Sequence, residues 1–195
     1  MARTERVADT LAHTGKGPLW HPAERRLYWV DVPAGALYRY DPATGENAVA
    51  YETDGAPIGG FTIESDGALL LFTHGAVERL VPGASDAETV LTVDAAGRFN
   101  DVIADPEGRV FAGAMPTADA LGDLYRIDTD GSARVVVEGL DIPNGMDFSG
   151  DWTAFYLAES EARRIDAFDY DYGTGEISNP ARSSRRHRET ASPTG

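Results

Sequence analysis

The stretch "AGRFNDVIADPEGRVFAGAM", residues 96–115, contains the pattern that decides the fold. A short apolar segment leads into the turn-like "DPEG" at 105–108, and the β-prone run "RVFAGAM" follows it. Related turns occur at "HPAE" (21–24), "ESDG" (64–67) and "FSGD" (148–151), so the starting positions are 43, 41 and 43 residues apart. A regular period of about 40–45 residues with several strands per unit is typical of a β-propeller blade.

The segments on either side of these turns agree with that interpretation. Runs rich in β-branched and aromatic residues follow the turns, and they read "RLYWVDV", "ALLLFTH", "RVFAGAM" and "TAFYLAES". Later segments such as "ALYRYD", "DLYRID" and "RIDAFDYD" indicate further strands, whereas a helical period of 3.6 residues is almost absent. We therefore expect an all-β fold in which each unit is a meander of three or four antiparallel strands.

The number of units predicts a partial propeller of about four blades. Propellers close with typically four to eight blades, and an open one leaves sheet edges exposed. Because the sequence stops inside its fourth unit, we expect a truncated or frameshifted chain whose open edges allow edge-to-edge self-association. A closed ring of four blades is the alternative.

Composition divides the chain into three segments. Residues 1–14 form a lead-in, 15–180 the partial propeller, and 181–195 a basic tail. The tail "ARSSRRHRETASPTG" contains four of the 17 basic residues but one of the 32 acidic residues, and it has no Val, Ile, Leu or aromatic residue. A segment with nothing to bury is expected to be disordered, and a frameshift would explain its different composition.

Charge and composition limit the classes of partner and the chemistry that the sequence allows. The net charge of −15 argues against nucleic acid, which requires a basic face. No apolar run approaches the roughly 18 residues of a membrane helix, and the N-terminus has no secretory apolar region, so we expect a cytoplasmic protein without membrane contact. Lys16 is the only lysine among the 17 basic residues, and together with the 32 acidic residues this suggests a halophilic source, although a GC-rich genome would also favour arginine over lysine. Cysteine is absent, which excludes thiolate chemistry.

Polar residues recur just before the first strand of the units. The innermost strands of a propeller line its central channel, so the loops that enter them converge on one mouth. We therefore expect five side chains to be neighbours there: Lys16, Arg98, Asn100, Asp101 and Asn144. Asn and Asp also form Asx-turns at strand entries, which is the purely structural alternative for each position.

Three motifs resemble the family of gluconolactonase, senescence marker protein (regucalcin) and luciferin-regenerating enzyme. They are "RFND" at 98–101, "NGMDFS" at 144–149 and "DAFDYD" at 166–171, and the similarity extends over residues 15 to about 179. The resemblance implies a six-bladed propeller that hydrolyses sugar lactones. It also implies one divalent cation at the axis, which is Ca²⁺, Zn²⁺, Mn²⁺ or Mg²⁺.

The resemblance also implies roles for individual residues. Asn144 matches a metal-binding asparagine, and Arg98, Asn100 and Asp101 are assigned to substrate binding. Lys16 stands where the family has a metal-binding glutamate. The aspartate of the family's P-D-G motif, which is both a metal ligand and the expected general base, has no counterpart in this sequence.

Two functions follow from this pattern. The first is metal-dependent hydrolysis of a sugar lactone to its aldonic acid, with the activity of this chain in doubt because Lys16 replaces a ligand and no catalytic residue can be assigned. The second is a non-catalytic propeller that binds a sugar acid, calcium or a protein partner at the same mouth.

Overall fold

The computed structural model describes residues 4–94 and 96–182, and within them the fold is all-β. Sixteen strands form four sheets of four strands each, and every sheet is a meander in which consecutive strands pair antiparallel. The expected β-propeller fold is therefore confirmed, with four blades present. The described part of the chain contains no helix with the length and apolarity needed for a membrane span.

The strands of the first blade are β1 (Gly15–His21), β2 (Arg26–Asp31), β3 (Ala36–Tyr40) and β4 (Asn47–Glu52). Those of the second are β5 (Gly60–Ile63), β6 (Leu69–Phe72), β7 (Ala76–Leu80) and β8 (Glu88–Thr92). Those of the third are β9 (Phe99–Ala104), β10 (Val110–Ala114), β11 (Gly122–Ile127) and β12 (Ala133–Leu140). Those of the fourth are β13 (Pro143–Phe148), β14 (Ala154–Glu159), β15 (Arg164–Asp171) and β16 (Glu176–Arg182).

The four recurring turns have equivalent places in the blades. Each joins the first strand of a blade to the second, for example between β9 and β10. In this turn Asp105 accepts hydrogen bonds from the backbone N–H groups of Glu107 and Arg109, both at 2.9 Å. The repeat in the sequence is thus a repeat of hairpins.

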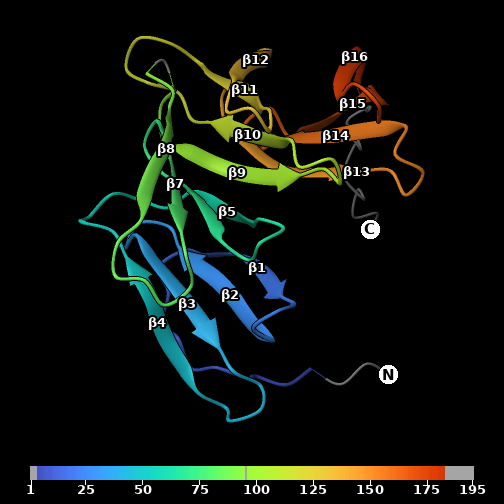
Figure 1. Cartoon of the computed structure of the whole chain (residues 1–195). Coiled ribbons are helices and arrows are strands. Elements are labelled where there is room, and N and C mark those ends of the chain that lie inside the picture. The colour runs from blue at the N-terminus through green and yellow to red at the C-terminus, as the bar shows by residue number, and fades with distance from the viewer. Residues whose placement is uncertain (1–3, 95, 183–195) are drawn as a thin grey trace, which may run out of the picture.

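The innermost strands lie next to one another in chain order, with contacts between β1 and β5, β5 and β9, and β9 and β13. Figure 1 shows the sheets following one another along an arc, from the blue first blade to the orange and red fourth blade. The first and fourth blades lie at the two ends of that arc. Strand β16 runs through Arg182, and residues 183–195 of the predicted tail lie outside the described residues.

Hydrophobic side chains pack between adjacent blades, as in a propeller. One core joins the first and second blades through residues such as Tyr28 and Leu71. A second joins the next pair through Phe72 and Phe99, whose rings meet edge to face. In the third core Phe111 of β10 is fully buried against the fourth blade. Strand β10 is buried along its whole length because both of its faces meet neighbouring blades.

Two glycines allow β9 to approach the second blade closely. A Cβ atom on Gly59 would lie 1.8 Å from the carbonyl oxygen of Phe99, and one on Gly60 would lie 2.9 Å from a methyl of Val102. Gly59 and Gly60 occupy the places that Lys16 and Gly17 occupy in the first blade. The second blade therefore contributes no side chain at these positions, which leaves the mouth to the other three blades.

Candidate functional site

The structure brings the five predicted site residues to one end of the inner strands. Lys16 lies in β1, Asn100 and Asp101 in β9 and Asn144 in β13, while Arg98 directly precedes β9. A cavity of about 300 Å³ opens there. Its lining residues come from three blades and their connecting loops: Thr14, Lys16, Val32, Pro33, Pro57, Arg98, Asn100 and Asn144.

The backbone is irregular at each strand that supplies a lining side chain. The pairing of β1 with β2 shifts between Lys16 and Leu19, and that of β13 with β14 shifts between Pro143 and Met146. The pairing of β9 with β10 also shifts, at Asn100. β-Bulges redirect side chains and are common beside functional sites. Gly17 in β1 and Gly145 in β13 have positive φ angles of 61° and 85°, and glycine adopts such angles without strain.

Lys16 connects the first blade to the third. Its ammonium donates a hydrogen bond to the carbonyl oxygen of Asn100 and lies 3.3 Å from Oδ1 of Asp101. The Lys16 and Asp101 side chains are 19% and 21% exposed, so the pair is largely shielded from water. Burial lowers the pKa of Lys16, and the nearby Arg98 lowers it further, whereas Asp101 acts in the opposite direction.

Asp101 extends this connection to the fourth blade. Its Oδ2 accepts a hydrogen bond of 2.7 Å from the backbone N–H of Gly145. Asp101 is not among the cavity-lining residues. Asp101 therefore supports the cavity from outside, because it contacts both the Lys16 ammonium and the backbone of Gly145 in the bulge next to Asn144.

The Asn100 amide is held from two sides. Its Nδ2 donates to the carbonyl oxygen of Pro143 at 2.9 Å, and its Oδ1 accepts from Arg98 at 3.4 Å. Arg98 also donates to the carbonyl oxygen of Phe99 at 3.1 Å, and burial lowers the pKa of its guanidinium. Both contacts use the same guanidinium nitrogen, Nη1, so the other two nitrogens have no partner among the described residues and can bind a ligand.

Asn144 differs from Asn100 in having a free amide. Within the described residues its side chain has no hydrogen-bond partner, although it lines the cavity. An amide supplies one acceptor and two donors, which suits hydroxyl and carbonyl groups of a small polar ligand. The cavity thus combines an unpaired amide with two cationic side chains.

The residues present do not fit a divalent cation. A hard cation such as Ca²⁺ takes six to eight oxygen ligands, among which carboxylates dominate. In the described part of the chain, no carboxylate lines the cavity and no three His, Asp or Glu side chains are grouped so that they could hold a metal. The Lys16 ammonium would repel a divalent cation at 4 Å by roughly 2 to 8 kcal/mol for dielectric constants of 80 to 20.

Sequence reasoning missed the residues that come from loops. Thr14, Pro33 and Pro57 line the cavity, and Thr14 is fixed by a 2.9 Å hydrogen bond from its backbone N–H to Asp31. The other carboxylate oxygen of Asp31 accepts the N–H of His13. The sequence offered one signal for Thr14, which was Asp31, a carboxylate at the end of β2 without an evident partner. Such a signal is weak in a chain with 32 acidic residues.

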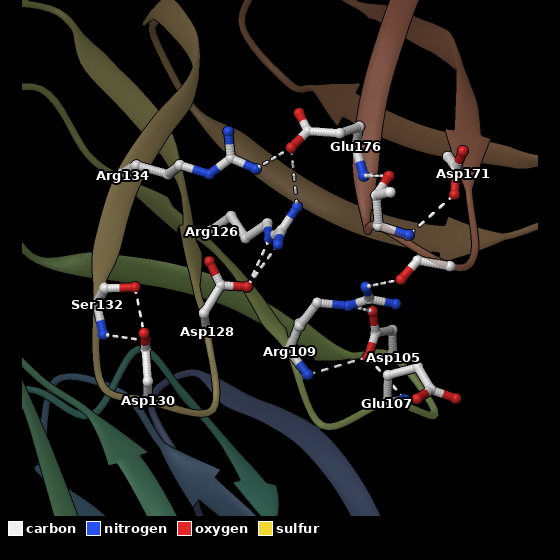
Figure 2. A network of polar contacts seen from close by, with 12 residues as sticks. Asp105, Glu107, Arg109, Arg126, Asp128, Asp130, Ser132, Arg134, Asp171 and Glu176 are labelled. Carbon is white, nitrogen blue, oxygen red and sulfur yellow. Dashed lines mark hydrogen bonds and ion pairs between the residues drawn. The ribbon is translucent and has the colours of Figure 1, made fainter.

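A polar network between the third and fourth blades was also missed (Figure 2). Asp105, at the end of β9 opposite the cavity, pairs with Arg109 and accepts a 2.6 Å hydrogen bond from the hydroxyl of Tyr170. Arg109 in turn donates to the carbonyl oxygen of Tyr172 at 2.6 Å. Burial raises the pKa of Tyr170, and the Asp105 carboxylate adds to this effect. These contacts tie the blades that carry Asn100 and Asn144 together.

The structure is thus a β-propeller with a cavity lined by two cationic side chains at one end of its inner strands. The model of the SMP-30/gluconolactonase/LRE-like region matches residues 14–195, and the chain belongs to this family. The pentonolactonase XacC of Haloferax volcanii is 51% identical over 174 residues, which are 89% of this chain and 59% of that protein. Rabbit (Oryctolagus cuniculus) regucalcin is 34% identical over 203 residues, covering 99% of this chain and 67% of regucalcin.

Solved structures show the same architecture. A calcium-binding regucalcin from Agrobacterium tumefaciens superposes with a TM-score of 0.81 at 20% identity, covering 90% of this chain and 61% of that one. A gluconolactonase from Xanthomonas campestris gives a TM-score of 0.73 at 22% identity, covering 88% and 62%. The chain thus spans about three fifths of the length of the pentonolactonase and of both solved structures.

Proposed function

We propose that this protein acts in the hydrolysis of sugar lactones and that the mouth cavity is the lactone site. Membership of the gluconolactonase family and 51% identity with a pentonolactonase support the substrate class. The observation that carries the proposal for this chain is the cavity itself, in which Lys16, Arg98 and the unpaired Asn144 amide converge.

These residues suit the charge that develops during the reaction. Water attacks the acyl carbon, the carbonyl oxygen becomes negative, and the ring C–O bond breaks as the ring oxygen takes up the proton that the water releases. Cationic donors fixed before the reaction stabilise such an oxyanion. We assign this role to Arg98 and Lys16, and we assign the binding of sugar oxygens to Asn144 and Asn100. Asp101 acts as a positioning residue through Lys16 and Gly145.

The test is the hydrolysis of glucono-δ-lactone and of a pentonolactone, followed by pH indicator in EDTA and with added Ca²⁺, Mn²⁺ or Zn²⁺ at several salt concentrations. We expect a saturable rate above the spontaneous background. Arg98→Met should lower kcat/KM at least tenfold because it removes a donor that lines the cavity. Arg6→Met, at an exposed position outside the cavity, is the matched control.

A rate equal to the background under all these conditions would reject hydrolysis by this chain. A second candidate function is non-catalytic binding of the sugar acid at the same cavity. It is favoured by the absence of a carboxylate among the lining residues, since a carboxylate would serve as general base. Binding of an aldonate without any lactone turnover would establish this second function.

A further inference from the structure

The charge of the cavity differs from that of the molecule. Lys16 and Arg98 both line it, and the acidic side chain that contacts Lys16 is Asp101. Among the described residues, two positive groups at the cavity are thus paired with one carboxylate, on a chain whose net charge is −15. A cavity with excess positive charge and low exposure favours an anionic ligand, because the ligand completes the charge balance.

The Lys16 ammonium is also fixed in space. Its contacts with Asn100 and Asp101 join β1 to β9, and the bond from Gly145 to Asp101 joins β9 to β13. An ammonium has three N–H donors. Asn100 and Asp101 account for two of them within the described residues, so the third is available at the cavity wall.

We infer that the Lys16 ammonium is the resident cation of this site and binds the carboxylate of a sugar acid together with Arg98, without a divalent metal. The lining residues do not fit a hard cation for the same reason, because the Lys16 ammonium already joins the inner strands β1 and β9. The ligand class rests on the proposed function, whereas the independence from metal rests on the Lys16 contacts alone.

Isothermal titration calorimetry of the full chain with sodium gluconate tests this inference. Titrations are made in EDTA, and again with Ca²⁺ or Mn²⁺ in place of EDTA. We expect binding in EDTA, with a dissociation constant that changes less than twofold when either cation is added. Lys16→Met should weaken binding at least tenfold, whereas Lys16→Arg, which keeps the charge, should weaken it less. Arg6→Met, which removes one exposed charge outside the cavity, should bind as the unaltered chain does.

Circular dichroism melting of each variant shows whether it is folded, and Ca²⁺ added to the unaltered chain should leave its Tm unchanged. Gluconate binding that requires a divalent cation, or a clear Ca²⁺-dependent rise in Tm, would overturn the inference. Failure to bind gluconate under any condition would overturn it as well. Gluconate binding in EDTA with no lactone turnover would reject hydrolysis and leave this inference standing, so the two failures are distinguishable.

Discussion

Replacing Asp105 with alanine is expected to lower the free energy of unfolding by about 3–5 kcal/mol, because it removes one partner of a buried ion pair. The Asp105 side chain is fully buried and that of Arg109 is 9% exposed. Loss of the carboxylate leaves the guanidinium of Arg109 without its countercharge and the hydroxyl of Tyr170 without its acceptor. Arg109 (Figure 2) also donates to the carbonyl oxygens of Tyr172 and Gly173 in the fourth blade, so the loss affects the packing of two blades.

Urea denaturation followed by circular dichroism measures this effect. Asp130→Ala is the matched control, because Asp130 also accepts a backbone N–H in a hairpin turn, that of Ser132 at 2.9 Å, but is exposed. We expect the control to lose about 1 kcal/mol or less. Equal losses for the two variants would show that Asp105 acts only within its turn. A double-mutant cycle with Arg109→Met should give a coupling energy of about 0.5–3 kcal/mol.

Replacing Lys16 with glutamate is expected to weaken gluconate binding at least a hundredfold, which corresponds to about 2.7 kcal/mol. The change places a carboxylate beside Asp101 and the carbonyl oxygen of Asn100, where the ammonium now lies. The cavity then has more acidic than basic groups around it, and an anionic ligand is repelled. The effect should exceed that of Lys16→Met, because the charge is reversed as well as removed.

Calorimetry in EDTA measures the loss, and Arg6→Glu supplies a matched charge reversal at an exposed position outside the cavity. This change should not produce cation-stimulated lactone hydrolysis, because no carboxylate of the described residues lines the cavity and one introduced glutamate supplies too few oxygen ligands for a hard cation. Lactone turnover by Lys16→Glu that rises with Ca²⁺ or Mn²⁺ above that of the unaltered chain would contradict this account. Gluconate affinity equal to that of the unaltered chain would contradict it equally.

The blades could be predicted because a single local feature recurs in each of them. Turns such as the one at Asp105 lie in hairpins whose strands are rich in β-branched, aromatic and other apolar residues, and their spacing indicates the repeat. The convergence of Lys16, Asn100 and Asn144 could be predicted from the same repeat, because each stands near the beginning of an inner strand.

The contacts that organise the site could not be predicted from the repeat. The ion pair of Lys16 with Asp101 crosses between the first and third blades, and the hydrogen bond of Tyr170 with Asp105 joins residues 65 positions apart. Such contacts depend on the relative placement of neighbouring blades and on the direction of each side chain. A local sequence pattern predicts neither of these. Gly17 and Gly145 were the one local signal, since glycines beside polar residues indicate bulges that redirect side chains.

A crystal structure of the chain grown with gluconate and EDTA tests the central claim most directly. The account predicts gluconate in the mouth cavity, with a carboxylate oxygen at a hydrogen-bonding distance of about 2.7–3.2 Å from Lys16 Nζ and from the Arg98 guanidinium. It also predicts that the sugar hydroxyls contact the Asn144 amide. Gluconate bound at another surface, or an empty mouth cavity at a saturating gluconate concentration, would contradict it.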